Sequence, residues 1–194
     1  MRLQEKAAAQ GDSFLTYAFP TEILSTNINL TTKSFEHICN RVCSDLEALD
    51  QDYNFDKIHI IGASLGCVNA TMIANSYPVS LMTLLVPGHC LAESLWDGIM
   101  TQHLRKEFES QGIRMLDLKW FWQDISPENN IDNLEDTGIS VHLSCADSVI
   151  PYRCGKQLVR SMRNWGLEPT VIENNHLGHY LTVFKYWIAK DSLK

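Results

Sequence analysis

The fold of this chain is decided by residues 57–66, which read KIHIIGASLG. The first half of this stretch is an apolar run typical of a β-strand, and a helix-like run over residues 67–76 follows it. Gly62 and Gly66 flank Ser64, which indicates a tight turn between strand and helix with the serine at its apex. We expect both glycines to be required, because the backbone of such a turn is crowded and a Cβ would clash.

Such a turn exposes the hydroxyl group of Ser64 at the start of a helix, clear of the sheet. The backbone N–H of Leu65 can then donate a hydrogen bond to negative charge that develops on a substrate attacked by the serine. A Gly-x-Ser-x-Gly pattern alone occurs by chance in roughly one chain of this size in fifteen. The strand and helix around the pattern, and the residues that follow later in the chain, therefore carry more weight than the pattern itself.

Strand-like and helix-like runs alternate along the chain. The predicted strands are residues 14–19, 57–61, 81–86, 139–144 and 170–173, and the predicted helices are residues 1–10, 34–49, 67–76, 152–165 and 181–190. Residues 21–33 are polar and predict a loop. The strands are apolar nearly throughout rather than alternating, which is typical of a parallel sheet covered on both faces. We therefore predict an α/β fold with a doubly wound, mostly parallel sheet and helices on both faces.

Residues 90–135 interrupt this alternation. They contain several helix-like runs, an aromatic cluster formed by Trp120, Phe121 and Trp122, and a polar exit. The segment is too short to enclose a core of its own. We therefore predict one domain over residues 1–194, with a small helical lid inserted at residues 90–135. The aromatic cluster packs inside the lid or, in a second interpretation, lines a substrate pocket.

The composition excludes several classes of function. The chain has 194 residues, a formal net charge of −7 and no run of Lys or Arg, so we expect no nucleic-acid partner. No apolar stretch is long enough to span a membrane, and the N-terminus lacks the apolar segment of a signal peptide. The six cysteines form no CxxC pair and predict reduced thiols in a cytoplasmic protein. A zinc site built on Cys39 and Cys43 is the alternative, but no second ligand pair lies near them.

Candidate catalytic side chains follow the predicted strands. In an open parallel sheet the ligand site lies at the carboxyl ends of the strands. The residues found there are Ser64, His89, Asp147 and, after the last strand, His176 and His179. A serine hydroxyl becomes a nucleophile when a base accepts its proton, an imidazole accepts a proton at neutral pH, and a carboxylate orients the imidazole. These residue types therefore predict a hydrolytic site at one edge of the sheet.

From about Leu15 to its C-terminus, the chain resembles the α/β-hydrolase family. The resemblance rests on three motifs in the family's order: the glycine-flanked turn around Ser64, the stretch Ala-Asp-Ser-Val-Ile-Pro around Asp147, and the Gly-His pair that ends at His179. It implies that Ser64 is the nucleophile, Asp147 the acid and His179 the base. It also implies that residues 90–135 form the cap that shapes the substrate pocket, and that the reaction needs no metal or organic cofactor.

The resemblance also predicts a second oxyanion donor, from a loop that often carries His-Gly and follows a strand before the first helix. The chain shows neither that strand nor that loop, so it resembles a family member without its N-terminal strands and oxyanion loop. One interpretation is a truncated chain with impaired activity. The other is that the strand over residues 14–19 pairs directly with the strand over residues 57–61, and the site uses another donor.

These observations predict a serine hydrolase that cleaves a small carboxylic ester or thioester through an acyl-enzyme on Ser64. His179 is the predicted base, because a glycine precedes it and a helix follows it, and His176 is the alternative base. The predicted walls of the substrate pocket are His89, His176, Trp120 and Trp122. Two other functions stay open: an acyltransferase, in which an alcohol or thiol replaces water, and a non-catalytic protein that binds a ligand on the same scaffold. The oligomeric state also stays open.

Overall fold

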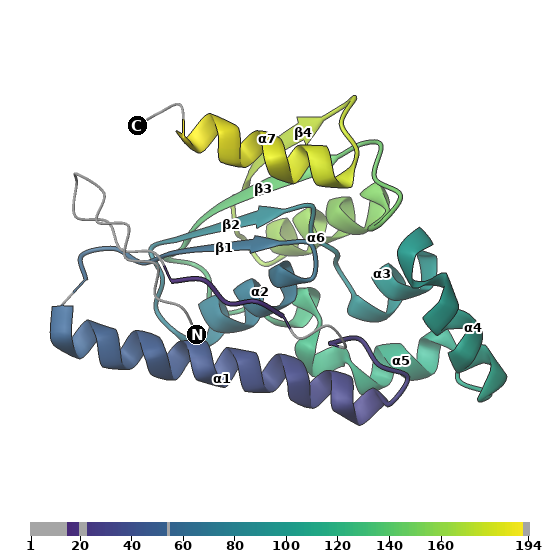
Figure 1. Cartoon of the computed structure of the whole chain (residues 1–194). Helices are drawn as coiled ribbons and strands as arrows, with labels where there is room; N and C mark the ends of the chain where they lie inside the picture. The colour runs from purple at the N-terminus through teal and green to yellow at the C-terminus, as the bar shows by residue number, and fades with distance from the viewer. Residues whose placement is uncertain (1–14, 20–22, 54, 192–194) are drawn as a thin grey trace.

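The strands of this protein form one parallel sheet. The computed structural model describes residues 15–19, 23–53 and 55–191, and the strands in these residues are β1 (His59–Ala63), β2 (Leu81–Leu85), β3 (Gly138–Ser144) and β4 (Thr170–Asn174). They lie side by side in the order β1-β2-β3-β4 (Figure 1). Ala63 pairs in register with Leu85, and Ser144 pairs with Asn174. Residues that follow the strands therefore meet at one edge of the sheet.

Helices cover both faces of the sheet, which confirms the predicted α/β architecture (Figure 1). The helices on one face are α1 (Ile28–Tyr53), α2 (Gly66–Ser76) and α6 (Tyr152–Asn164), and the helix on the other face is α7 (His179–Asp191). α2 is buried from Cys67 to Ala74, because it packs between the sheet and α1. α1 contributes Phe35, Cys39 and Val42 to the core, at the spacing of one helical face.

Residues 90–135 form a series of short helices, of which α3 and α4 lie beyond the carboxyl ends of the strands (Figure 1). The helices are α3 (Leu91–Asp97), η1 (Ile99–Thr101), α4 (Gln102–Ser110), α5 (Met115–Phe121), η2 (Gln123–Ile125) and η3 (Pro127–Asn129). Phe108, Leu118 and Trp122 from this segment are fully buried in the same core as Phe35 of α1. The segment therefore shares the core of the main sheet and helices, and its role as a lid stays a prediction.

α1 is longer than the predicted helix over residues 34–49, and it begins within the predicted loop. Asn27 precedes its first residue. The Oδ1 atom of Asn27 accepts a hydrogen bond from the N–H of Leu30 at 3.2 Å, and its carbonyl oxygen accepts one from the N–H of Thr31 at 3.2 Å. Asparagine is a favoured N-cap residue because it satisfies N–H groups that lack partners in the first turn. The buried position of the first turn is occupied by Thr31, a polar residue, so apolar spacing does not mark this start.

The predicted strand over residues 14–19 is absent from the part of the chain that the structure describes. Residues 15–19 have no regular secondary structure, and residue 14 lies outside the described residues, as does the predicted helix over residues 1–10. Among the described strands, β1 pairs with β2 alone. The second interpretation, in which this segment pairs directly with β1, is therefore wrong for residues 15–19. A strand needs a neighbour that completes its hydrogen-bond ladder, and local apolar composition does not supply one.

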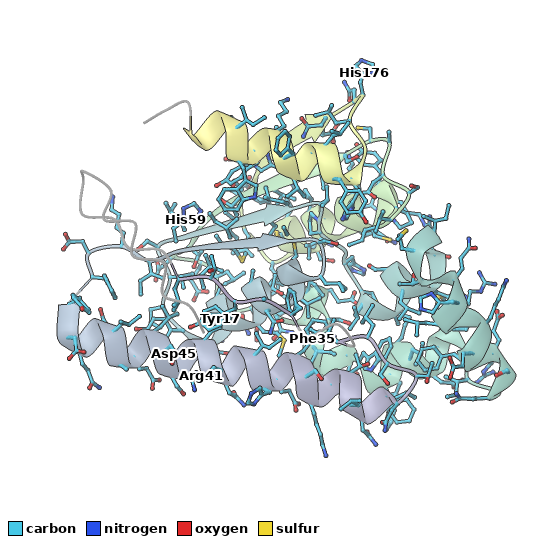
Figure 2. All side chains as sticks on the ribbon, viewed as in Figure 1. Tyr17, Phe35, Arg41, Asp45, His59 and His176 are labelled. Atoms are coloured by element: carbon cyan, nitrogen blue, oxygen red, sulfur yellow. The ribbon has the colours of Figure 1, made fainter. Side chains whose placement is uncertain are left out.

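The segment of residues 15–19 packs against α1 instead. The hydroxyl of Tyr17 donates a hydrogen bond to Asp45 at 2.9 Å, and both side chains lie close together in Figure 2. The ring of Phe19 lies 6.2 Å from the ring of Phe35, measured between centroids. These contacts explain the apolar character that suggested a strand, because the aromatic side chains complete the core beside α1 and α2.

Candidate active site

Ser64 lies between the end of β1 and the start of α2 in a left-handed backbone conformation, with a φ of 55°. Its N–H donates a hydrogen bond to the carbonyl oxygen of Leu85 at 2.9 Å, and its own carbonyl oxygen accepts one from the N–H of Cys67 at 2.9 Å. Residues other than glycine rarely adopt a positive φ, and such strain persists where surrounding contacts enforce it. The contact with β2 and the first turn of α2 therefore hold the serine at the apex.

Gly62 is required by the packing of this turn, whereas Gly66 is not. A Cβ at Gly62 would lie 2.7 Å from the Cβ of Ala70, 2.7 Å from the carbonyl oxygen of Gly66 and 2.8 Å from the Cα of Cys67. A Cβ at Gly66 would lie 3.5 Å from the ring of Phe19, which is an ordinary van der Waals contact. The expectation that both glycines are required is therefore wrong for Gly66, because the side chain of Phe19 lies at an ordinary contact distance from the added Cβ.

Substitution of Gly62 by alanine is expected to destabilise the protein by about 3 kcal/mol, because backbone atoms of the turn cannot move aside without displacing α2. The matched variant Gly66→Ala should change the free energy of unfolding by less than about 1 kcal/mol. Urea unfolding curves of the two variants and the unsubstituted protein measure both effects. Equal midpoints for the two variants would show that crowding at Gly62 does not constrain the turn.

His179 joins Ser64 to Asp147 through two hydrogen bonds. Its Nε2 lies 2.9 Å from the Oγ of Ser64, a residue 115 positions away in the sequence, and its Nδ1 lies 2.7 Å from the Oδ2 of Asp147. The side chains of His179 and Asp147 are only 4% and 2% exposed, so water competes little for these bonds. The structure thus brings together the three residues that the sequence analysis singled out as nucleophile, base and acid.

The turn after β3 holds the carboxylate of Asp147 in place. Its Oδ1 accepts hydrogen bonds from the N–H groups of Val149 and Ile150, both at 2.9 Å. Short side chains such as Asp often accept hydrogen bonds from the backbone two or three residues further on. This local bonding occupies one carboxylate oxygen and leaves Oδ2 directed at the imidazole of His179.

The position of His179 is set by the loop between β4 and α7. The hydroxyl of Ser144, at the end of β3, donates a hydrogen bond to the carbonyl oxygen of Leu177 at 2.6 Å. The N–H of Thr182 then donates to the carbonyl oxygen of Gly178 at 3.0 Å, within the first turn of α7. His179 is the first residue of that helix, so the sheet and the helix together fix where its ring lies.

This arrangement can remove a proton from Ser64. An ionised carboxylate only accepts hydrogen bonds, so the Nδ1 of a neutral His179 carries the proton in its bond to Asp147. The Nε2 is then unprotonated and accepts the hydrogen bond of the Ser64 hydroxyl. An imidazole held in this tautomer can act as a general base and then return the proton to a leaving group.

The N–H of Leu65 is the predicted donor to negative charge beside Ser64. Leu65 is the residue immediately before α2. No acceptor among the described residues pairs with its backbone N–H. The N-terminus of a helix also carries partial positive charge. An oxygen that becomes negative beside Ser64 would therefore meet an available donor and a favourable field.

A cavity of about 350 Å³ opens beside these groups. Ser64 and His179 both line it. The remaining lining residues are Ala63, Val149, Tyr180, Val183, Phe184 and Trp187. The volume is at the lower end of the range of about 300–1,000 Å³ that is usual for small-molecule sites.

Known structures share this fold. No protein-family model and no curated protein sequence matches the chain. The acylaminoacyl peptidase of Pyrococcus horikoshii superposes with a TM-score of 0.61 and 15% identity, over 79% of this chain and 24% of the peptidase chain. The chain has the α/β-hydrolase fold. It spans roughly a quarter of that peptidase.

Two further structures of this α/β-hydrolase fold are similar to the chain. Acetyl xylan esterase 1 from Thermoanaerobacterium sp. JW/SL YS485 has a TM-score of 0.51 and 16% identity, over 64% of this chain and 40% of the esterase. A puromycin-hydrolyzing peptidase of Mycobacterium tuberculosis has a TM-score of 0.52 and 12% identity, over 62% of this chain and 18% of the peptidase. At these identities the similarity establishes the fold alone.

His89, which we expected to line the pocket of this α/β-hydrolase fold, bonds elsewhere. It does not line the cavity at Ser64, and its Nε2 lies 2.5 Å from the Oε2 of Glu128 in the inserted segment. Burial alone would raise the pKa of the Glu128 carboxyl, but the hydrogen bond and charge of His89, together with the Lys119 ammonium, bring that pKa below its usual value. The pair therefore ties the end of β2 to the insert.

The other three predicted pocket walls also lie outside this cavity. Trp122 is fully buried in the core, and its indole N–H donates to the carbonyl oxygen of Ile28 at 3.3 Å, so its expected contact with substrate is wrong here. Trp120 is 67% exposed on α5 and packs edge-on against Phe121. His176 lies at the exposed tip of the loop between β4 and α7 and points away from the sheet (Figure 2).

The cavity walls on α7 were missed by the sequence analysis. Tyr180, Val183, Phe184 and Trp187 recur at helical spacing and share one face of the helix. That spacing was present in the sequence, but it resembles the core stripe of any amphipathic helix. A stripe indicates which residues share a face, and it does not show whether that face meets a core or a cavity.

No helix among the described residues combines the length and apolar character needed to cross a bilayer. No group of three or more His, Cys, Asp or Glu side chains in this part of the chain is arranged to hold a metal ion. All six cysteines are free thiols.

Proposed function

We propose that the protein is a serine hydrolase that cleaves a small carboxylic ester or thioester. The observation that carries the proposal is the hydrogen-bonded series from Asp147 through His179 to Ser64, closed at 2.7 and 2.9 Å. An exposed serine turn does not by itself indicate catalysis. A serine bonded to a buried imidazole, which is bonded in turn to a buried carboxylate, is the arrangement that activates a hydroxyl.

The reaction proceeds in two half-reactions. The Oγ of Ser64 attacks the carbonyl carbon while its proton passes to the Nε2 of His179, and the N–H of Leu65 stabilises the resulting oxyanion. The tetrahedral intermediate collapses, the bond to the alcohol or thiol breaks, and His179 gives its proton to the departing oxygen or sulfur. Water then attacks the acyl-enzyme, again losing a proton to His179, and releases the acid and free Ser64. Asp147 stabilises the imidazolium in both halves.

Hydrolysis of amides or peptides is the second candidate. It is favoured by the acylaminoacyl peptidase, which has the same fold and a TM-score of 0.61. The same three residues would serve, but an amide is less reactive and its nitrogen must be protonated as it leaves. Comparison of p-nitrophenyl acetate with the corresponding anilide separates the two candidates. A higher kcat/KM for the anilide than for the ester would replace the ester proposal.

The proposal also includes a cytoplasmic location, which the six free thiols favour.

Labelling with a fluorophosphonate probe tests the proposal. The probe should bond to a single serine in the native protein, and mass spectrometry of the digest should place it on Ser64. Ser64→Ala should lose the label, whereas the matched variant Ser110→Ala, at an exposed position on α4, should keep it. Absence of label on the folded native protein would contradict the proposal and favour a non-catalytic binding protein. Transfer of the acyl group to an added alcohol in place of water would favour an acyltransferase.

A further inference from the structure

The cavity beside Ser64 is bounded on one side by α7. We define the α7 groove by Ala63, Val149, Tyr180, Val183, Phe184 and Trp187. The four residues from α7 lie at positions i, i+3, i+4 and i+7, so they form one continuous wall that starts directly after His179. Ala63, at the end of β1, and Val149, in the turn after β3, complete the lining.

The chemistry of the α7 groove is apolar and aromatic. None of its lining residues carries a charge. Tyr180, Phe184 and Trp187 are 67%, 61% and 41% exposed, although large aromatic side chains are usually buried in soluble proteins. Exposed aromatic rings that surround a cavity next to reactive groups are typical of a site that receives an apolar part of a ligand.

The geometry indicates which part of an ester would enter the groove. The carbonyl oxygen must lie near the N–H of Leu65, at the start of α2, and α2 and α7 lie on opposite faces of the sheet (Figure 1). The oxygen of the leaving group must instead lie near the Nε2 of His179, because that atom supplies its proton. The groove begins at the residue after His179, so it adjoins the leaving group.

We infer that the α7 groove binds the alcohol portion of the substrate and makes the enzyme selective for esters of apolar alcohols. This inference rests on the proposed function and extends it to the leaving group. In the acylation step the bond between the carbonyl carbon and the alcohol oxygen breaks, the electron pair stays on that oxygen, and the proton on His179 completes the free alcohol. Tyr180 to Trp187 spans about 10 Å along the helix axis. At about 1.3 Å per carbon, an alkyl chain of about eight carbons matches this length.

Two series of esters test the inference. In the first, the acid is acetic acid and the alcohol lengthens from ethanol to octanol. In the second, the alcohol is ethanol and the acyl group lengthens from acetyl to octanoyl. Full burial of one methylene corresponds to about a fourfold gain, and a groove open on one side should give about twofold. We therefore expect kcat/KM, which reports acylation, to rise about 50-fold from ethyl to octyl acetate. A rise confined to the acyl series would overturn the assignment.

Two variants locate the effect in the α7 groove. Val183→Trp fills it and Phe184→Ala removes one wall, and each should lower the ratio of kcat/KM for octyl over ethyl acetate by about tenfold. Phe184 is 61% exposed, so the fold should tolerate its substitution. Phe184→Ala therefore still tests the inference if the larger side chain in Val183→Trp prevents folding. The matched control is Trp165→Ala, whose side chain is 62% exposed beyond the end of α6, and it should leave the ratio unchanged. An unchanged ratio in Phe184→Ala would overturn the inference.

A binding measurement separates this inference from the proposed function. Ser64→Ala cannot form an acyl-enzyme, but its α7 groove is intact. Titration with 1-octanol, followed by ligand-observed NMR, should give saturable binding that Phe184→Ala weakens about tenfold. Octanol binding by a protein that hydrolyses no ester would contradict the proposed function and keep the groove as an apolar binding site. Ester hydrolysis without octanol binding would keep the function and overturn the groove.

Discussion

Replacing His179 with alanine is expected to lower kcat for ester hydrolysis by about 10⁶-fold. The imidazole is the group that accepts the proton of Ser64 and later returns it, and its Nε2 lies 2.9 Å from the Oγ of that serine. Without it, the hydroxyl stays protonated at neutral pH and is a weak nucleophile. Steady-state hydrolysis of p-nitrophenyl acetate, with fluorophosphonate labelling as a second readout, measures the loss.

His176→Ala is the matched control for this prediction. His176 was the alternative base, and its place at an exposed loop tip predicts that kcat changes by less than about twofold (Figure 2). Residues that act as one unit are also strongly non-additive. The double variant Ser64→Ala with His179→Ala should therefore be no less active than either single variant. A large loss in His176→Ala, with activity kept in His179→Ala, would reverse the assignment of the base.

Replacing Asp147 with asparagine is expected to lower kcat by about 10⁴-fold, with little change in stability. The carboxylate oxygen Oδ2 accepts a hydrogen bond from the protonated Nδ1 of His179, and the two atoms lie 2.7 Å apart. This bond keeps Nε2 unprotonated. An asparagine amide in the same place donates a hydrogen bond to Nδ1 and moves the ring proton to Nε2. The imidazole then donates to Ser64 instead of accepting from it, and the base is lost.

The fold of the Asp147→Asn variant should persist, because its side-chain oxygen can still accept the hydrogen bonds from Val149 and Ile150. Thermal unfolding measured beside kcat checks this. Asp136→Asn is the matched control, since it removes one exposed carboxylate from the loop before β3. Activity in Asp147→Asn within about tenfold of the native protein would mean that the carboxylate does not set the tautomer.

The sequence predicted the main elements because each of them is encoded by neighbouring residues. The apolar runs of β2, β3 and β4 and the helix α6 lie within one or two residues of their predicted bounds. α1 was predicted too short, since its start is set by the Asn27 cap and the buried position of its first turn holds the polar Thr31. Residues 15–19 were predicted as a strand, although their aromatic side chains pack on α1. A strand depends on a pairing partner elsewhere in the chain, which local composition does not reveal.

The candidate site was predicted in part. The sequence singled out Ser64, Asp147 and His179, and their catalytic roles stay predictions that the variants above test. It placed both Trp120 and Trp122 at the pocket, yet one lies on the surface and the other in the core. Two neighbouring aromatic residues have the same local signal, and only the packing of α5 against the rest of the insert and α1 decides which one turns inward.

By itself, the sequence determined the strand, turn and helix around Ser64, because adjacent residues encode that geometry and a side chain at Gly62 would collide with α2. Only the tertiary structure decided that the imidazole of His179, 115 residues from Ser64, lies within hydrogen-bonding distance of both Ser64 and Asp147. It also decided that one face of α7 borders a cavity. The physical reason is the separation along the chain of the residues involved. Backbone conformation depends on neighbouring residues, whereas contact between distant side chains depends on how the parallel strands align and how the helices pack on them.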